Sequence, residues 1–98
     1  MKVTLDKNGS TLKVSVSGRL DTTTAPELEK TLGSQLEGIE SLTLDFAELA
    51  YISSAGLRVL LALQKKMNRQ GQMVVTHVND NIMEVFDVTG FVDMLTIR

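Results

Sequence analysis

The stretch from Leu44 to Leu57 constrains the fold of this chain more than any other part of the sequence. Its first residues alternate apolar with polar, with Leu44 and Phe46 on one side, which predicts a strand with one buried face. Two adjacent hydroxyls, Ser53 and Ser54, then precede a long run of apolar residues at helical spacing. Serine is a preferred helix N-cap, so a helix is expected to begin at one of these two serines.

This helix is expected to run to about Gln70, with Gly71 as its stop. Its predicted buried stripe consists of Gly56, Val59, Leu60, Leu63 and Met67. Because Gly56 has no side chain, the first turn of the helix can approach the sheet closely. Leu57 and Leu61 lie on a neighbouring flank, and we expect both to be partly exposed.

The remaining segments have equally regular patterns. They predict a hairpin over residues 3–20 around an Asn-Gly turn, a helix over 26–36, and strands over 42–46, 73–78 and 94–97. A further helix is expected to be capped by Asn79 or Asn81 and to end at Gly90. Residues 47–52 are expected to form a connection whose apolar side chains are tucked against the core. The order is therefore ββαβαβαβ, an α/β fold in which helices cover a mixed sheet, and residues 1–98 are expected to form one domain.

Length and composition exclude several classes of function. The 98 residues have a formal net charge of −2 and no cysteine, which removes disulfides and thiolate metal sites. Lysines and arginines do not form a basic run, so we expect no nucleic-acid partner. No apolar stretch approaches the ~20 residues that a membrane-spanning helix needs. We expect a monomer in the cytoplasm that has no membrane partner.

Residues that could support catalysis are sparse. His77 is the only histidine, and its position within an apolar strand pattern favours a packing role. Asp45 and Glu48 are close in sequence, but two carboxylates near a turn are weak evidence for acid–base chemistry. No glycine-rich phosphate loop of the Walker type is present. The sequence therefore predicts a protein that is not an enzyme and that has no cofactor or metal site.

The serine pair is the strongest candidate for a functional site. A helix start exposes unpaired N–H groups and the positive end of the helix dipole, which stabilise an anion. A phosphate on such a serine would add roughly −1.5 to −2 charges there. Alternatively, one serine is only the N-cap, a role worth ~1 kcal/mol. Asp21 also follows a predicted strand and is either a helix cap or a polar group beside the serines.

Three ordered segments carry a family resemblance: residues 42–45 with 51–57 (LTLD and YISSAGL), residues 17–21 with 24–25 (SGRLD and TA), and residues 85–91 (VFDVTGF). Together they resemble the STAS family, which includes the bacterial anti-sigma factor antagonists. The resemblance implies binding to an anti-sigma factor that is also a serine kinase, with release of the sigma factor. The kinase would phosphorylate Ser54 and weaken the complex, and a serine phosphatase would reverse this. Asp21 matches the family's aspartate near that serine.

A docking face can be proposed around this serine. Its predicted members are Asp21, Thr22, Thr23, Thr24, Ser53, Ser54, Leu57, Arg58 and Leu61. They combine a hydroxyl at a helix start with apolar side chains that are expected to be partly exposed.

One position departs from the family pattern. The residue before the phospho-acceptor is often aspartate, and here it is Ser53, which becomes a second candidate for modification. Two alternatives therefore remain open. One is a STAS module that is never phosphorylated and that regulates a transporter or another partner. The other is an enzyme with Ser54 as nucleophile, although its motif offers no base.

Overall fold

The computed structural model describes all of residues 1–98. The elements in chain order are β1 (Lys2–Asn8), β2 (Thr11–Leu20), α1 (Ala25–Gly33), β3 (Ser41–Asp45), β4 (Leu49–Ile52), α2 (Ser54–Asn68), β5 (Gln72–Thr76), α3 (Asp80–Thr89) and the 3₁₀ helix η1 (Phe91–Asp93). The α/β class and the helix-covered mixed sheet that the sequence predicts are thus confirmed.

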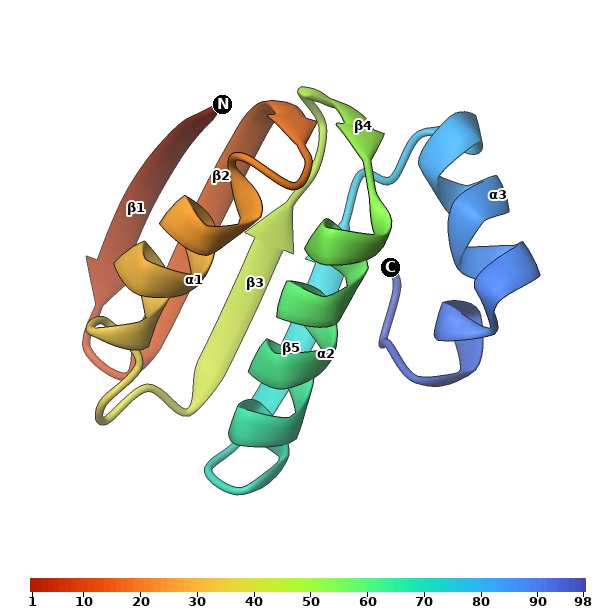
Figure 1. Cartoon of the computed structure of the whole chain (residues 1–98). Helices are drawn as coiled ribbons and strands as arrows, with labels where there is room; N and C mark the ends of the chain where they lie inside the picture. Colours follow the sequence, from red (N-terminus) through yellow and green to blue (C-terminus); the bar gives the residue numbers. More distant parts are fainter.

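The long strand β2 organises the sheet (Figure 1). It pairs antiparallel with β1 through the hairpin, and its first half pairs parallel with β3, from Thr11 opposite Ser41 to Ser15 opposite Asp45. Its last three residues leave β3 and pair parallel with β4 instead. Strand β5 lies on the far side of β3, so the main order is β1-β2-β3-β5.

One apolar core joins the sheet and the helices. Helices α1 and α2 lie across the same face of the sheet in Figure 1, and α3 lies beyond β4 and β5. The largest fully buried side chains are Phe46, Phe86, Leu12, Leu20, Leu28, Leu32, Leu36, Ile39, Leu42, Leu44, Leu49 and Leu60. Most come from strands and helices, because alternate strand positions and every third or fourth helix position face the same layer. Leu36, Ile39 and Phe46 belong to the connecting segments.

Two expectations about the strands are wrong. Residues 49–52 are not a connection but the strand β4, which pairs with the last three residues of β2, beyond the point where β2 pairs with β3. The β2–β4 pairing contains a register shift between Gly18 and Arg19. Gly18 has φ +87°, a conformation that glycine adopts without a steric penalty. The expected strand over 94–97 is reduced to one bridge between Val75 and Ile97, and η1 occupies the chain just before it.

Some element boundaries also differ from expectation. Helix α1 ends at Gly33 rather than at Leu36. Helix α3 agrees with one of its two expected starts: Asn79 is the cap, and its carboxamide oxygen accepts from the N–H of Ile82 at 2.9 Å. His77 does not lie within a strand: β5 ends at Thr76, and His77 is exposed with a left-handed φ of 57°.

The first turn of α2 approaches the sheet as closely as the backbone allows. A Cβ atom on Gly56 would lie 2.8 Å from Cγ1 of Ile52, 2.9 Å from Cγ of Leu20 and 3.0 Å from the carbonyl oxygen of Leu20. Gly56 was expected to permit a close approach of α2 to the sheet, and the packing in fact requires a glycine at this position.

Substitution of Gly56 by alanine should test this contact. Overpacking against Leu20 and Ile52 is expected to lower the free energy of unfolding by about 1–3 kcal/mol. Gly33→Ala is the control, because a Cβ there meets no atom within 4 Å. It should stabilise the protein by about 0.4–1 kcal/mol. Urea denaturation of both variants would measure the difference, and equal effects would contradict the close-approach argument.

Candidate functional site

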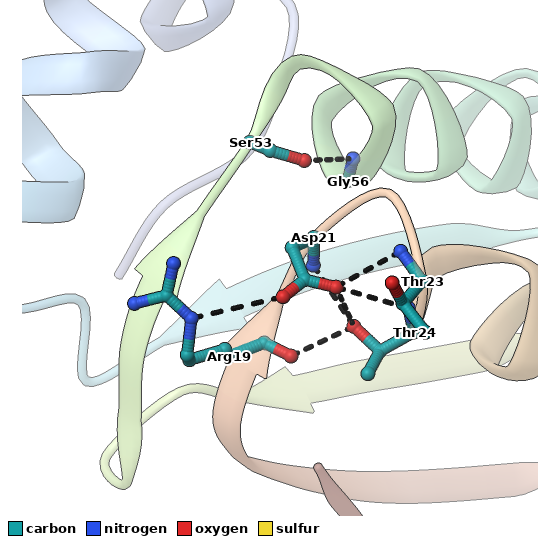
Figure 2. Close-up of polar contacts among 6 residues, drawn as sticks. All are labelled: Arg19, Asp21, Thr23, Thr24, Ser53 and Gly56. Carbon is teal, nitrogen blue, oxygen red and sulfur yellow. Dashed lines mark hydrogen bonds and ion pairs between the residues drawn. The ribbon is translucent and has the colours of Figure 1, made fainter.

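The ends of β2 and β4 meet the start of α2 at one edge of the sheet. The backbone N–H of Ser53 donates to the carbonyl oxygen of Leu20 at 2.9 Å, so the residue before α2 is bound to the last residue of β2. Asp21 follows directly, and Figure 2 shows its carboxylate on the segment beside Ser53. The structure thus brings together two polar segments that are about 30 residues apart in the sequence.

The two serines have different environments. Ser53 is half-buried, and its hydroxyl accepts from the N–H of Gly56 at 3.4 Å, as an N-cap does (Figure 2). Ser54 is the first residue of α2 and is exposed. Helix capping therefore uses Ser53, and the hydroxyl of Ser54 remains accessible at the positive end of the helix dipole.

The loop after β2 is held by Asp21 and Thr24. The Oδ1 atom of Asp21 accepts from the N–H groups of Thr23 at 3.0 Å and Thr24 at 3.1 Å (Figure 2). In return, the Thr24 hydroxyl accepts from the N–H of Asp21 at 2.8 Å and donates to the carbonyl oxygen of Arg19 at 2.7 Å. These bonds fix the entry into α1, and Thr22 and Thr23 are exposed on the loop.

Hydrogen bonding at this loop changes the acidity of Asp21. The backbone N–H of Thr24 is the main cause that lowers the pKa of Asp21, and partial desolvation opposes it. The N–H of Thr23, the hydroxyl of Thr24 and the Arg19 guanidinium lower this pKa further. All of these groups favour the ionised carboxylate, so Asp21 is a fixed negative charge near the start of α2.

Arg19 and Tyr51 form a pair that the sequence did not reveal. The two residues are opposite each other in the β2–β4 register, and Cζ of Arg19 lies 4.1 Å from the centroid of the Tyr51 ring. Nε of Arg19 is also 3.7 Å from Oδ2 of Asp21. A cation over an aromatic face is attracted by the ring quadrupole. Tyr51 is 40% exposed, so the pair extends the polar surface beside Ser53.

The flank of α2 matches expectation only in part. Leu57 is 6% exposed and belongs to the core, so the expectation that it would be partly exposed is wrong. Leu61 is half-buried, and Arg58 is exposed. A shallow hollow of about 420 Å³ lies between the starts of α1 and α2, lined by Thr22, Ala25, Pro26, Glu29, Ala55, Arg58 and Val59. Thr22 and Arg58, predicted from separate segments, therefore share one surface.

Asp45 and His77 have structural roles on another side of the molecule. Oδ1 of Asp45 accepts from the N–H of Ala47 at 2.9 Å and lies 3.1 Å from Nδ1 of His77. The Ala47 bond is the main cause that lowers the pKa of Asp45, with smaller contributions from His77 and Lys13. No group of three or more histidine, aspartate or glutamate side chains could hold a metal ion.

Comparison with known proteins shows the family of this chain. Residues 2–98 match the STAS domain family. BtrV of Bordetella bronchiseptica, named as an anti-sigma factor antagonist, is 35% identical over 99 residues, covering 99% of this chain and 85% of BtrV. The anti-sigma-B factor antagonist of Staphylococcus epidermidis is 31% identical over 88 residues, covering 88% of this chain and 82% of that protein. The chain belongs to the STAS domain family, and these relatives are named for a regulatory role.

The anti-sigma factor antagonist SpoIIAA has the same fold. Its unphosphorylated form matches with a TM-score of 0.77 and 13% identity, covering 99% of this chain and 87% of SpoIIAA. Its phosphorylated form matches with the same TM-score of 0.77 and 14% identity, covering 99% and 91%. The family resemblance that the sequence suggests is therefore confirmed.

None of the helices combines the length and apolar character that crossing a membrane would require.

Removal of the Asp21 carboxylate should destabilise the protein in a pH-dependent manner. Because the folded state lowers the pKa of Asp21, its contribution is fully present above the unfolded-state pKa of about 3.9. That contribution disappears as the pH falls through the lower folded-state value. Asp21→Ala is therefore expected to lower the melting temperature at pH 7, and the difference from wild type should shrink below about pH 4.

Asp21→Asn provides the matched control, because the carboxamide keeps an acceptor oxygen for the Thr23 and Thr24 N–H groups. It should lower the melting temperature less than Asp21→Ala does. Thermal unfolding monitored by circular dichroism at several pH values measures all three proteins. A difference between wild type and Asp21→Ala that stays constant down to pH 2.5 would show that the carboxylate charge is not involved.

Proposed function

We propose that this protein is an anti-sigma factor antagonist that is switched by phosphorylation of Ser54. It binds an anti-sigma factor that is also a serine kinase, and this binding releases the sigma factor. The kinase transfers phosphate to Ser54, the complex weakens, and a serine phosphatase restores the active form. The names of the relatives support the binding role. We expect a protein with this role to act in the cytoplasm.

The observation that carries the proposal is the separation of roles between the two serines. The cap of α2 uses the Ser53 hydroxyl, and the close contact with the sheet uses Gly56. The exposed hydroxyl of Ser54 takes part in neither the helix cap nor the contact with the sheet. A phosphate there can therefore be added and removed while the helix start and the core remain unchanged.

Electrostatics favours the phosphorylated state within the folded domain. The first N–H groups of a helix have no intrahelical partner and can donate to a phosphate. Arg58 lies one helical turn after Ser54 and is exposed, and a negative group four residues before a cation is a favourable order. The equal match of this fold to unphosphorylated and phosphorylated SpoIIAA is consistent with a phosphate that leaves the fold intact.

The proposed docking face surrounds Ser54. It consists of the loop residues Asp21, Thr22, Thr23 and Thr24, the pair Ser53 and Ser54, and Arg58 and Leu61 on α2. The hollow between Thr22 and Arg58 can receive a partner side chain. Arg19 and Tyr51 add two of the three residue types that are enriched among the residues that dominate the binding energy of interfaces.

Mimicry of the phosphate should separate binding from folding. Ser54→Asp places a negative charge in the docking face, which is expected to weaken binding to the cognate anti-sigma factor by about 10- to 100-fold. The same charge at a helix N-terminus should leave the melting temperature equal or slightly higher. Isothermal titration calorimetry and thermal unfolding measure the two effects.

Alanine variants of both serines complete the test. Ser53→Ala removes the N-cap and should cost about 0.5–2 kcal/mol of stability, and it should weaken binding less than Ser54→Asp does, because it adds no charge. Ser54→Ala should bind normally but incorporate no phosphate from ATP. Unchanged affinity of Ser54→Asp would refute the switch. Absence of phosphate on the protein isolated from its native cells would favour a STAS module that regulates a transporter or another partner without phosphorylation.

A further inference from the structure

The exposed side of α2 has an unusual distribution of charge. Residues 54–69 include four cations, Arg58, Lys65, Lys66 and Arg69, and no aspartate or glutamate. All four are exposed, and the ion pairs of the protein involve other residues. Four unpaired cations on one helix therefore face solvent without any internal compensation.

Most of these cations share one line with Ser54. At about 100° per residue, Ser54, Arg58, Leu61, Lys65 and Arg69 fall within a sector of about 80°. The buried face, which includes Gly56, Leu60, Leu63 and Met67, is on the opposite side of the helix. We call the exposed line, together with Ala62 beside it, the α2 stripe. From Arg58 to Arg69 it is about 16 Å long.

The far half of the α2 stripe has a recess with basic walls. A shallow hollow of about 430 Å³ is lined by Ala62, Lys65, Lys66 and Arg69. Leu61 is half-buried near the middle of the stripe, between Arg58 and Lys65. An apolar centre with a charged rim is the usual anatomy of a protein–protein interface.

We infer that the α2 stripe docks an acidic surface of the anti-sigma factor along the whole of α2, from Ser54 to Arg69. The inference rests on the proposed function and adds the chemistry of the partner: carboxylates that face Arg58 and Arg69, with one that enters the hollow between Lys65 and Lys66. A phosphate on Ser54 then places a negative group at one end of a positively charged surface that binds negatively charged partners.

A protein partner fits this surface better than other polyanions. Duplex DNA binders commonly make 6–10 phosphate contacts, and four cations on a chain of net charge −2 supply fewer. Residues 70–97 contain no lysine or arginine, so the cationic surface does not continue onto α3. Binding to an anionic membrane is strengthened by apolar side chains that insert as well as by charge, and the stripe offers only Leu61 and Ala62 for insertion.

A second copy of this chain is also a less suitable partner for the α2 stripe than an acidic surface of another protein. The acidic residues of α3 and η1 could face the α2 stripe of another molecule. Such a contact would join different surfaces, so it would build a ring or an open chain rather than a two-fold dimer. It would also cover Ser54, which the proposed kinase must reach.

Charge reversal tests the inference. The stripe variant combines Lys65→Glu with Arg69→Glu, two positions far from Ser54. The control is the β1 variant, which combines Lys2→Glu with Lys7→Glu and makes the same change in net charge. The probe is the anti-sigma factor that binds the wild-type protein. The stripe variant is expected to associate about 10-fold more slowly at low ionic strength, and the difference should vanish at high salt. The β1 variant should associate at nearly the wild-type rate.

Neutral variants separate docking from helix stability. Cations in the last turn also favour the helix dipole, so Lys65→Gln with Arg69→Gln should lower the melting temperature slightly. If that were their only role, association would stay at the wild-type rate. The inference requires slower association in this variant also, measured by stopped-flow mixing at a temperature where both proteins are fully folded.

Each other outcome is decisive. Equal association rates for the stripe and β1 variants would overturn this inference and leave the proposed function standing. A wild-type protein that binds no anti-sigma factor would overturn both. The wild-type protein could instead bind a DNA duplex, phosphatidylserine vesicles or a second copy of itself. If the stripe variant abolished that binding and left anti-sigma factor binding unchanged, the assignment of an acidic protein partner would be overturned. Analytical ultracentrifugation and vesicle co-sedimentation supply those measurements.

Discussion

The close contact between the first turn of α2 and the ends of β2 and β4 determines the arrangement of the whole site. Gly56 leaves no room for a Cβ atom between the helix and the side chains of Leu20 and Ile52. The N–H of Ser53 is bonded to the carbonyl oxygen of Leu20 at the same point. With the helix fixed in this way, its rotation about its own axis is fixed as well. The cap residue then points inward, and the next hydroxyl, on Ser54, points to solvent.

Strand β2 connects this contact to the loop that contributes the other half of the site. Its residues from Thr11 to Ser15 pair with β3, and its last three, from Gly18 to Leu20, pair with β4. The carboxyl end of β2 therefore places Asp21 beside the start of α2, as is typical at the carboxyl edge of parallel strands. The carboxylate is occupied by the N–H groups of Thr23 and Thr24. Its negative charge thus stabilises a loop, and the loop in turn presents Thr22 to the hollow beside Arg58.

Much of the fold could be predicted because its signals are periodic. The hairpin, the three helices and the strands β3 and β5 each combine regular apolar spacing with recognisable turns or caps. Strand β4 could not be recognised, because only Leu49 and Ile52 of its four residues are buried and no alternation results. The pair Arg19–Tyr51 was missed for the same reason, since its contact depends on the β2–β4 register.

The site shows the same division between local and tertiary information. The helix start and its two serines are local features, and the sequence located both. Which serine caps the helix depends on backbone geometry, which spacing does not contain. The burial of Leu57 was misjudged because helical spacing shows the direction in which a side chain points. It does not show how much of the helix surface the neighbouring elements cover. His77 resembled a strand residue until its left-handed backbone showed that β5 ends one residue earlier.

The C-terminal residues of the chain cover part of one edge strand of the sheet. The N–H of Val75 donates to the carbonyl oxygen of Thr96 at 2.8 Å, and the N–H of Arg98 donates to the carbonyl oxygen of Val75 at 2.9 Å. These bonds occupy part of the outer side of β5, where unpaired backbone groups would otherwise be available to a foreign strand. The opposite border is β1, whose exposed charges at Lys2, Asp6 and Lys7 discourage the addition of a strand. Both borders are thereby protected against unintended sheet growth, and recognition is left to side chains on the helical surface.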